Sequence, residues 1–286
     1  MKAPRIDNQF PHAGLAAYFA RVTWTDRARA ERIAQLLVDE RWPWLPCWLS
    51  YSGLHKRDDR KAGRVGGKNG AGPILDALLS DKLMTLRLNR ARGDGDFTTV
   101  MLNLDREKEK WSEGYQLRVT CRSAELPEGK SFEGWIELMH ELLVEVGALH
   151  ATIGAWPTYD LAMCDTWLTR MVLDTPSGDI DLGLPEAFQE QISLVSQWRK
   201  LMGRVYARHP RWGTYLHDGH LAAIGGVERV RAEVEPARIE RVSDLTYIQL
   251  TDSIDTGLTP LAGERRRRLE HLMAPILVGA PRPDAG

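Results

Sequence analysis

Hydrophobic and polar residues alternate most regularly in the middle of the chain. Runs at 84–89, 97–104 and 117–122 each place apolar side chains at every second position, and the Asp94-Gly95 turn leads into the second run. Side chains two residues apart on a strand point to the same face of a sheet. The three runs therefore predict an antiparallel meander with one buried face.

Further strands are expected before and after this meander. After a lead-in at 1–14, aromatic and aliphatic residues alternate through 17–24, and a short strand is expected at 47–51. A basic, glycine-rich segment at 55–72 reads as a surface loop, because glycine and polar residues favour irregular backbone. Alternation returns at 149–156, which predicts another strand.

Apolar residues spaced three and four apart predict helices between the strands. Thr25 or Asp26 can cap a helix that runs to about Glu40. Pro73 can begin a short helix, and Ser131 can cap a longer one. Each of these helices has an apolar stripe that a sheet can bury.

The C-terminal part of the chain repeats this mixture. We expect strands at 211–216, 237–242 and 245–250. We expect helices at 159–171, 185–209, 218–224, 227–234 and 259–276. Asp218 is the expected cap of the short helix that follows the first of these strands. In the last helix, Leu261 and Leu269 are expected to face the core.

These elements predict an α+β fold with a mostly antiparallel sheet and helices packed on one face, built from two α+β halves. A change in composition marks the expected boundary between the halves, because residues 171–198 contain no lysine or arginine. The expected subdomains are 1–170 and 171–286, and a single continuous domain is the alternative.

The same span carries carboxylates without counter-charges. Such a run keeps a negative potential and can dock on a basic surface, whereas the alternative is an ordinary acidic linker and helix start. The candidate partner-binding residues are Asp174, Asp179, Asp181, Glu186 and Glu190.

Composition excludes several classes of protein. The net charge is −1 and 43% of residues are hydrophobic. These values argue against wholesale disorder, a dedicated nucleic-acid coat and a membrane-surface protein. The cysteines, Cys47, Cys121 and Cys164, form no C-x-x-C pair, and the N-terminus has no secretory h-region. We therefore expect a cytoplasmic protein that binds neither nucleic acid nor membranes directly.

The motifs tested for chemistry fail on spacing. The 55–72 segment lacks the phosphate-loop pattern, because Ala62 and Asn69 stand where glycine and Ser or Thr belong. His209, His217 and His220 do not match a metal-ligand spacing. We expect no catalytic residue, metal or cofactor. Two alternatives stay open: a phosphate- or nucleotide-handling enzyme that uses the 55–72 loop with His217 and His220, and a structural adaptor subunit.

Both ends of the chain resemble a known family. The segment 18–37 and the closing section 211–253 resemble the immunity protein 52 family of bacterial polymorphic toxin and type VI secretion systems. The matching positions near the C-terminus are Trp212, Thr214, Tyr215, Leu216, Leu250 and Thr251. The resemblance implies a protein that binds and neutralises one cognate toxin, typically a restriction-endonuclease-like DNase. It carries over no functional residue.

Overall fold

The computed structural model describes the greater part of the chain. The described residues are 12–19, 24–42, 47–52, 60–66, 70–80, 83, 85–89, 99–103, 116–122, 130–156, 207–254 and 259–277. The expected helices at 159–171 and 185–209 and the expected boundary near residue 170 lie outside them, apart from residues 207–209.

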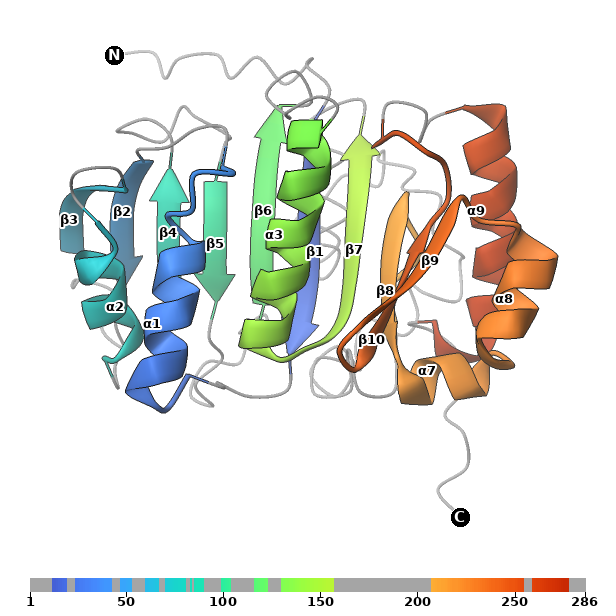
Figure 1. Ribbon diagram of the computed structural model, residues 1–286, viewed down its shortest axis with the longest axis horizontal. Helices are drawn as coiled ribbons and strands as arrows, with labels where there is room; N and C mark the ends of the chain where they lie inside the picture. The colour runs from blue at the N-terminus through green and yellow to red at the C-terminus, as the bar shows by residue number, and fades with distance from the viewer. Residues whose placement is uncertain are drawn as a thin grey trace, which may run out of the picture.

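One antiparallel sheet of ten strands forms the centre of the molecule (Figure 1). Its order in space is β3-β2-β4-β5-β6-β1-β7-β8-β10-β9, and each strand is antiparallel to its neighbours. The strands are β1 (His12–Phe19), β2 (Cys47–Ser52), β3 (Arg60–Val65), β4 (Thr85–Asn89), β5 (Thr99–Asn103), β6 (Gln116–Arg122), β7 (Ala148–Trp156), β8 (Gly213–His217), β9 (Arg238–Val242) and β10 (Leu245–Gln249).

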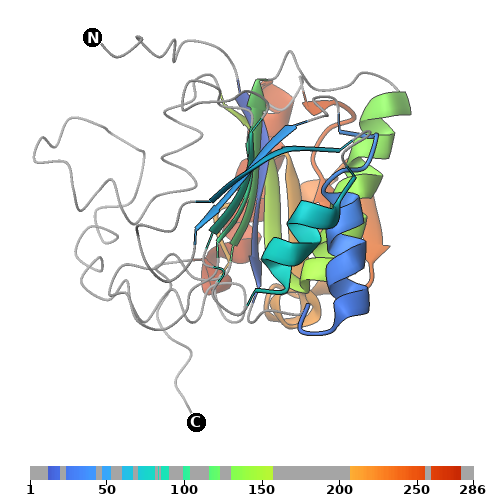
Figure 2. The ribbon, with the colours of Figure 1, turned by 90° about the vertical axis from the view of Figure 1, so that its left-hand side faces the viewer.

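Helices cover opposite faces of the sheet in its two halves. The helices are α1 (Arg27–Leu36), α2 (Gly72–Leu78), α3 (Lys130–Val146), α7 (Asp218–Ala223), α8 (Gly226–Val234) and α9 (Pro260–Met273). Figure 2 shows α1, α2 and α3 together on one side of the sheet. Among the helices that the structure describes, none has the length and apolar character needed to cross a membrane.

The two faces of β8 and β10 bury different cores. Tyr215 lies opposite Tyr247 in the register, and both pack into the core beneath α1, α2 and α3. Leu216 and Ile248 point the other way, into a second core that also contains residues of α7, α8 and α9. Alternate residues of one strand thus serve both layers, because successive side chains point to opposite faces.

The α+β class is confirmed, and strands from both halves join in one sheet. Seven residues of β1 pair with β6 on one side, and β1 pairs with β7 on the other. β7 in turn pairs with β8, from His150 opposite Leu216 to Ile153 opposite Gly213. The hydrogen-bonded ladder therefore runs from β3 to β9 without interruption.

Two expected boundaries in the N-terminal half were wrong. β1 begins at His12, inside the expected lead-in, because Ala13 and Leu15 are buried in the core. Residues 60–65 of the expected 55–72 loop form the edge strand β3, which pairs with β2 and buries Val65. The polar sequence did not indicate a strand here. Pairing with β2 satisfies the backbone N–H and C=O groups of β3 that face β2.

Helix ends and faces also differ from expectation in places. Asp26 caps α1 as expected, but α1 ends at Leu36. His217 caps α7 instead of Asp218, which forms an ion pair with Arg241. Leu261 is 51% exposed, because the buried stripe of α9 is centred one position further along the helix. That stripe contains Ala262, Leu269 and Met273.

Gly14 in β1 provides a test of the sheet packing. A Cβ added there would lie 2.1 Å from the Val119 carbonyl oxygen of β6. Gly14→Ala should therefore destabilise the protein by about 3 kcal/mol, because the central ladder must shift to admit the methyl group. Gly263→Ala in α9 is the control, since nothing lies within 4 Å of its Cβ position. The control should stabilise by about 0.5–1 kcal/mol, and urea unfolding measures both changes.

Candidate functional site

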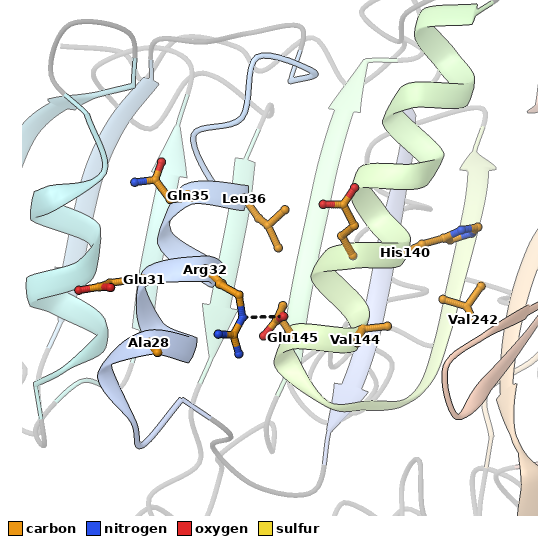
Figure 3. A pocket seen from close by; sticks show the side chains of 10 residues that line it. Ala28, Glu31, Arg32, Gln35, Leu36, His140, Val144, Glu145 and Val242 are labelled. Carbon is orange, nitrogen blue, oxygen red and sulfur yellow. Dashed lines mark hydrogen bonds and ion pairs between the residues drawn. The ribbon is translucent and has the colours of Figure 1, made fainter.

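A hollow of about 820 Å³ lies on the helical face, where α1 and α3 run side by side (Figure 3). Figure 3 shows the α1 residues along one wall and Glu145 of α3 across from them, while His140 extends from α3 toward Val242 of β9. The lining residues are Ala28, Glu31, Arg32, Gln35, Leu36, His140, Glu141, Val144, Glu145 and Val242. Apolar groups and charged groups both line the hollow.

Arg29 fixes the distance between the two helices at the end of α3. Its Nε donates to the Glu145 carbonyl oxygen at 2.7 Å, and its Nη2 donates to the Val144 carbonyl oxygen at 2.9 Å. The last carbonyl groups of a helix have no partner within the helix, so a guanidinium group there satisfies them and complements the helix dipole. Arg29 thus acts as a side-chain cap that α1 supplies to α3.

Two further ion pairs connect the α1 side to α3. Arg32 Nε lies 2.9 Å from Glu145 Oε1, and Arg41 Nη1 lies 2.7 Å from Glu141 Oε1. Arg41 also donates to Asp39, and this hydrogen bond lowers the pKa of Asp39. The rim of the hollow therefore contains paired charges of both signs.

His140 is the buried polar group of the hollow. The residue is 9% exposed, and its ring lies 5.6 Å from that of Tyr215 and 5.0 Å from that of Tyr247. Burial lowers the pKa of His140, so the imidazole is neutral at pH 7. Among the described residues, Nε2 of His140 finds no hydrogen-bond partner. It can still form one more hydrogen bond.

The helical layer carries more carboxylates than basic groups. The described residues from 24 to 42, 70 to 80 and 130 to 147 supply the acids Asp26, Glu31, Asp39, Glu40, Asp76, Glu133, Glu137, Glu141 and Glu145. The basic residues of the same ranges are Arg27, Arg29, Arg32, Arg41 and Lys130. In α3 the glutamates recur every fourth residue, which places them along one side of the helix.

The opposite sheet face beside these strands is basic. Arg87 and Arg118 alternate with the buried leucines and valines of β4 and β6, so they point away from α1, α2 and α3. Arg64 of β3 lies opposite Trp48 and is exposed. Arg118 is buried, and its Nε donates to Gln116 Oε1 at 3.1 Å. The helical layer thus carries an excess of carboxylates, and Arg64, Arg87 and Arg118 lie on the other face.

The histidines singled out from the sequence do not form a metal site in the described part of the chain. His209 Nδ1 lies 2.5 Å from Glu270 Oε1, and this contact lowers the pKa of Glu270. His217 Nδ1 accepts a hydrogen bond from Gly219 N, and its ring centroid lies 3.9 Å from that of His220, with the two ring planes tilted by 31°. Over these residues no group of three or more His, Cys, Asp or Glu side chains could hold a metal ion.

The structure does not describe the expected partner-binding acids. Asp174, Asp179, Asp181, Glu186 and Glu190 all lie outside the described residues, and their role stays a prediction. The α1–α3 hollow was missed because its walls are more than 100 residues apart in the chain. The four-residue spacing of the α3 glutamates was the one sequence signal that pointed to it.

His150 is a buried polar side chain that the sequence did not single out. Its Nε2 accepts a hydrogen bond from the Arg208 backbone N–H at 3.0 Å, so Nδ1 carries the proton and donates to the Tyr215 carbonyl oxygen at 2.7 Å. The side chain is fully buried, and burial lowers its pKa to about 4. A neutral imidazole thus joins β7, β8 and the segment before β8.

Arg29→Ala tests the helix cap. The change removes the Arg29 donor from the Glu145 carbonyl oxygen and leaves the Val144 carbonyl oxygen with the Gly147 N–H, so stability should fall by about 1–2 kcal/mol. Arg27→Ala is the matched control, because Arg27 is exposed and pairs with Glu31 of the same helix. The control should lose less than about 0.5 kcal/mol in urea unfolding. Equal losses for both variants would contradict the capping role.

His150 should also make stability depend on pH. Its folded pKa is lowered from the ordinary 6.5 to about 4, so the unfolded state binds more protons between these values. Stability is therefore full above pH 6.5 and should fall by about 3 kcal/mol as pH drops to 4. Urea unfolding at several pH values measures the slope. In His150→Gln the slope over this window should shrink; an unchanged slope would assign it to other groups, such as His140.

Comparison with solved structures shows a likeness in fold. No family model matches the chain, and no curated protein matches it. Among solved structures, the Pseudomonas aeruginosa T6SS protein PA0821 superposes with a TM-score of 0.55 at 11% identity. The alignment covers 96% of this chain and 77% of that chain. At this identity the likeness shows that the two chains share a fold.

Proposed function

We propose that this chain is an immunity protein that acts in the cytoplasm and neutralises a cognate toxin of a type VI secretion system by binding it. A restriction-endonuclease-like DNase is the toxin we expect. The observation that carries the proposal is the structural likeness to a T6SS protein over 96% of this chain. The sequence resemblance of both chain ends to the immunity protein 52 family points to the same role.

The chemistry of the described residues supports binding rather than catalysis. His217 caps a helix, His209 pairs with a carboxylate, and His150 joins two strands. The parts of the 55–72 segment that the structure describes are strand β3 and the start of α2, and the sequence of this segment lacks the glycine and hydroxyl spacing of a phosphate loop. An immunity protein needs a stable complementary surface, and the charged helical face offers one.

The test uses the protein encoded beside this chain's gene. Both proteins are produced together and purified through a tag on one of them, and cleavage of plasmid DNA is measured with and without this chain. We expect a stoichiometric complex and suppression of cleavage, because immunity requires tight binding. A DNase encoded in an unrelated locus is the control and should stay active. If no complex forms and cleavage continues, the immunity role is wrong.

A further inference from the structure

We propose that the hollow between α1 and α3 is where the partner docks, and that it receives a segment carrying arginine or lysine beside apolar side chains. This inference rests on the proposed function, because it names the surface and the partner chemistry of that binding role. The expectation that the acids of residues 171–198 bind the partner is unchanged, because the structure does not describe those residues. Three independent observations lead to it.

The first observation is the charge that remains after internal pairing. Glu31, Glu141 and Glu145 pair with arginines of the same layer. Glu137 lies between Glu133 and Glu141 on α3 and is exposed, and the described residues include no ion pair to it. The layer thus keeps a surplus of negative charge, which attracts a basic segment and repels an acidic one.

The second observation is the shape of the hollow. Leu36 is 9% exposed, and Val144 is partly buried against the core, so an apolar base lies below a charged rim. Glu31, Arg32 and Gln35 form the α1 part of that rim. An apolar centre inside a polar rim is the usual anatomy of a protein–protein interface. The apolar base suits aliphatic side chains, and the rim suits the basic groups beside them.

The third observation is His140. This neutral imidazole lines the hollow, is 9% exposed, and has no hydrogen-bond partner for Nε2 among the described residues. A buried polar group without a partner is unfavourable, so a ligand that supplies one gains affinity. Figure 3 shows this side chain on the side of α3 away from α1, toward Val242, so the docked segment must also cover that side to supply the hydrogen bond.

A steric block tests the location. Ala28 lines the hollow on α1 and is exposed, whereas Ala232 is exposed on α8, which packs on the second core. Ala28→Trp should raise the Kd for the neighbouring gene product at least about tenfold, because the indole fills the docking space. Ala232→Trp should leave the Kd unchanged. Isothermal calorimetry measures binding, and equal melting temperatures show that both variants fold.

Charge reversal tests the partner chemistry. Glu31→Lys combined with Glu137→Lys should raise the Kd about tenfold and slow association at low salt, with a smaller effect at high salt. The control combines Glu228→Lys with Glu233→Lys on α8, where both glutamates are exposed and pair with arginines of the same helix. The control should bind like the unmodified protein.

The outcomes separate the two proposals. If the neighbouring protein binds and only the hollow variants weaken binding, both proposals stand. If it binds all variants equally, the docking site is wrong while the immunity role stands. If it does not bind, the immunity role is wrong, and a synthetic helical peptide with arginine and leucine on one face then decides the docking site. Failure of that peptide to bind, or equal binding to Ala28→Trp, would overturn the inference.

Discussion

The pairing of β7 with β8 holds the structure together, and the buried imidazole of His150 stabilises this pairing. A fully buried imidazole must satisfy both nitrogens, and His150 does so with one backbone group on β8 and one on the segment that precedes it. The strands of the two halves therefore form one ladder from β3 to β9. Both layers of helices depend on this ladder, since α3 and α7–α9 pack on opposite faces of the same strands.

The packing of α1, α2 and α3 on the sheet also decides where the charged side chains of these helices lie. α1, α2 and α3 bury one apolar stripe each, and the remaining positions of α3 carry four glutamates, whereas those of α1 carry three arginines and one glutamate. The reverse side of β4 and β6 carries arginines. An excess of one sign of charge in a layer costs some stability through self-repulsion. Arg29, Arg32 and Arg41 offset part of that repulsion by connecting α1 and its following turn to α3.

The same contacts make the helical face suitable for a partner. The arginine contacts hold α1 and α3 apart at a fixed distance, so the hollow between them exists before any partner arrives. A preformed site loses little conformational entropy on binding. This feature accords with a protein whose proposed role is to recognise one toxin tightly.

The sequence by itself determined the types of the elements and several of their ends. Alternation predicted β4, β5, β6 and β7, and cap residues such as Asp26 and Thr259 marked helix starts correctly. These signals are local, because period and capping depend on neighbours in the chain.

The tertiary structure alone decided which elements meet. It placed β1 between β6 and β7, turned part of a polar loop into the edge strand β3, and brought Arg29 to the end of α3. It also gave His150 and His140 their surroundings. Contacts between residues more than 100 positions apart depend on strand pairing and packing, which leave no periodic trace in the sequence.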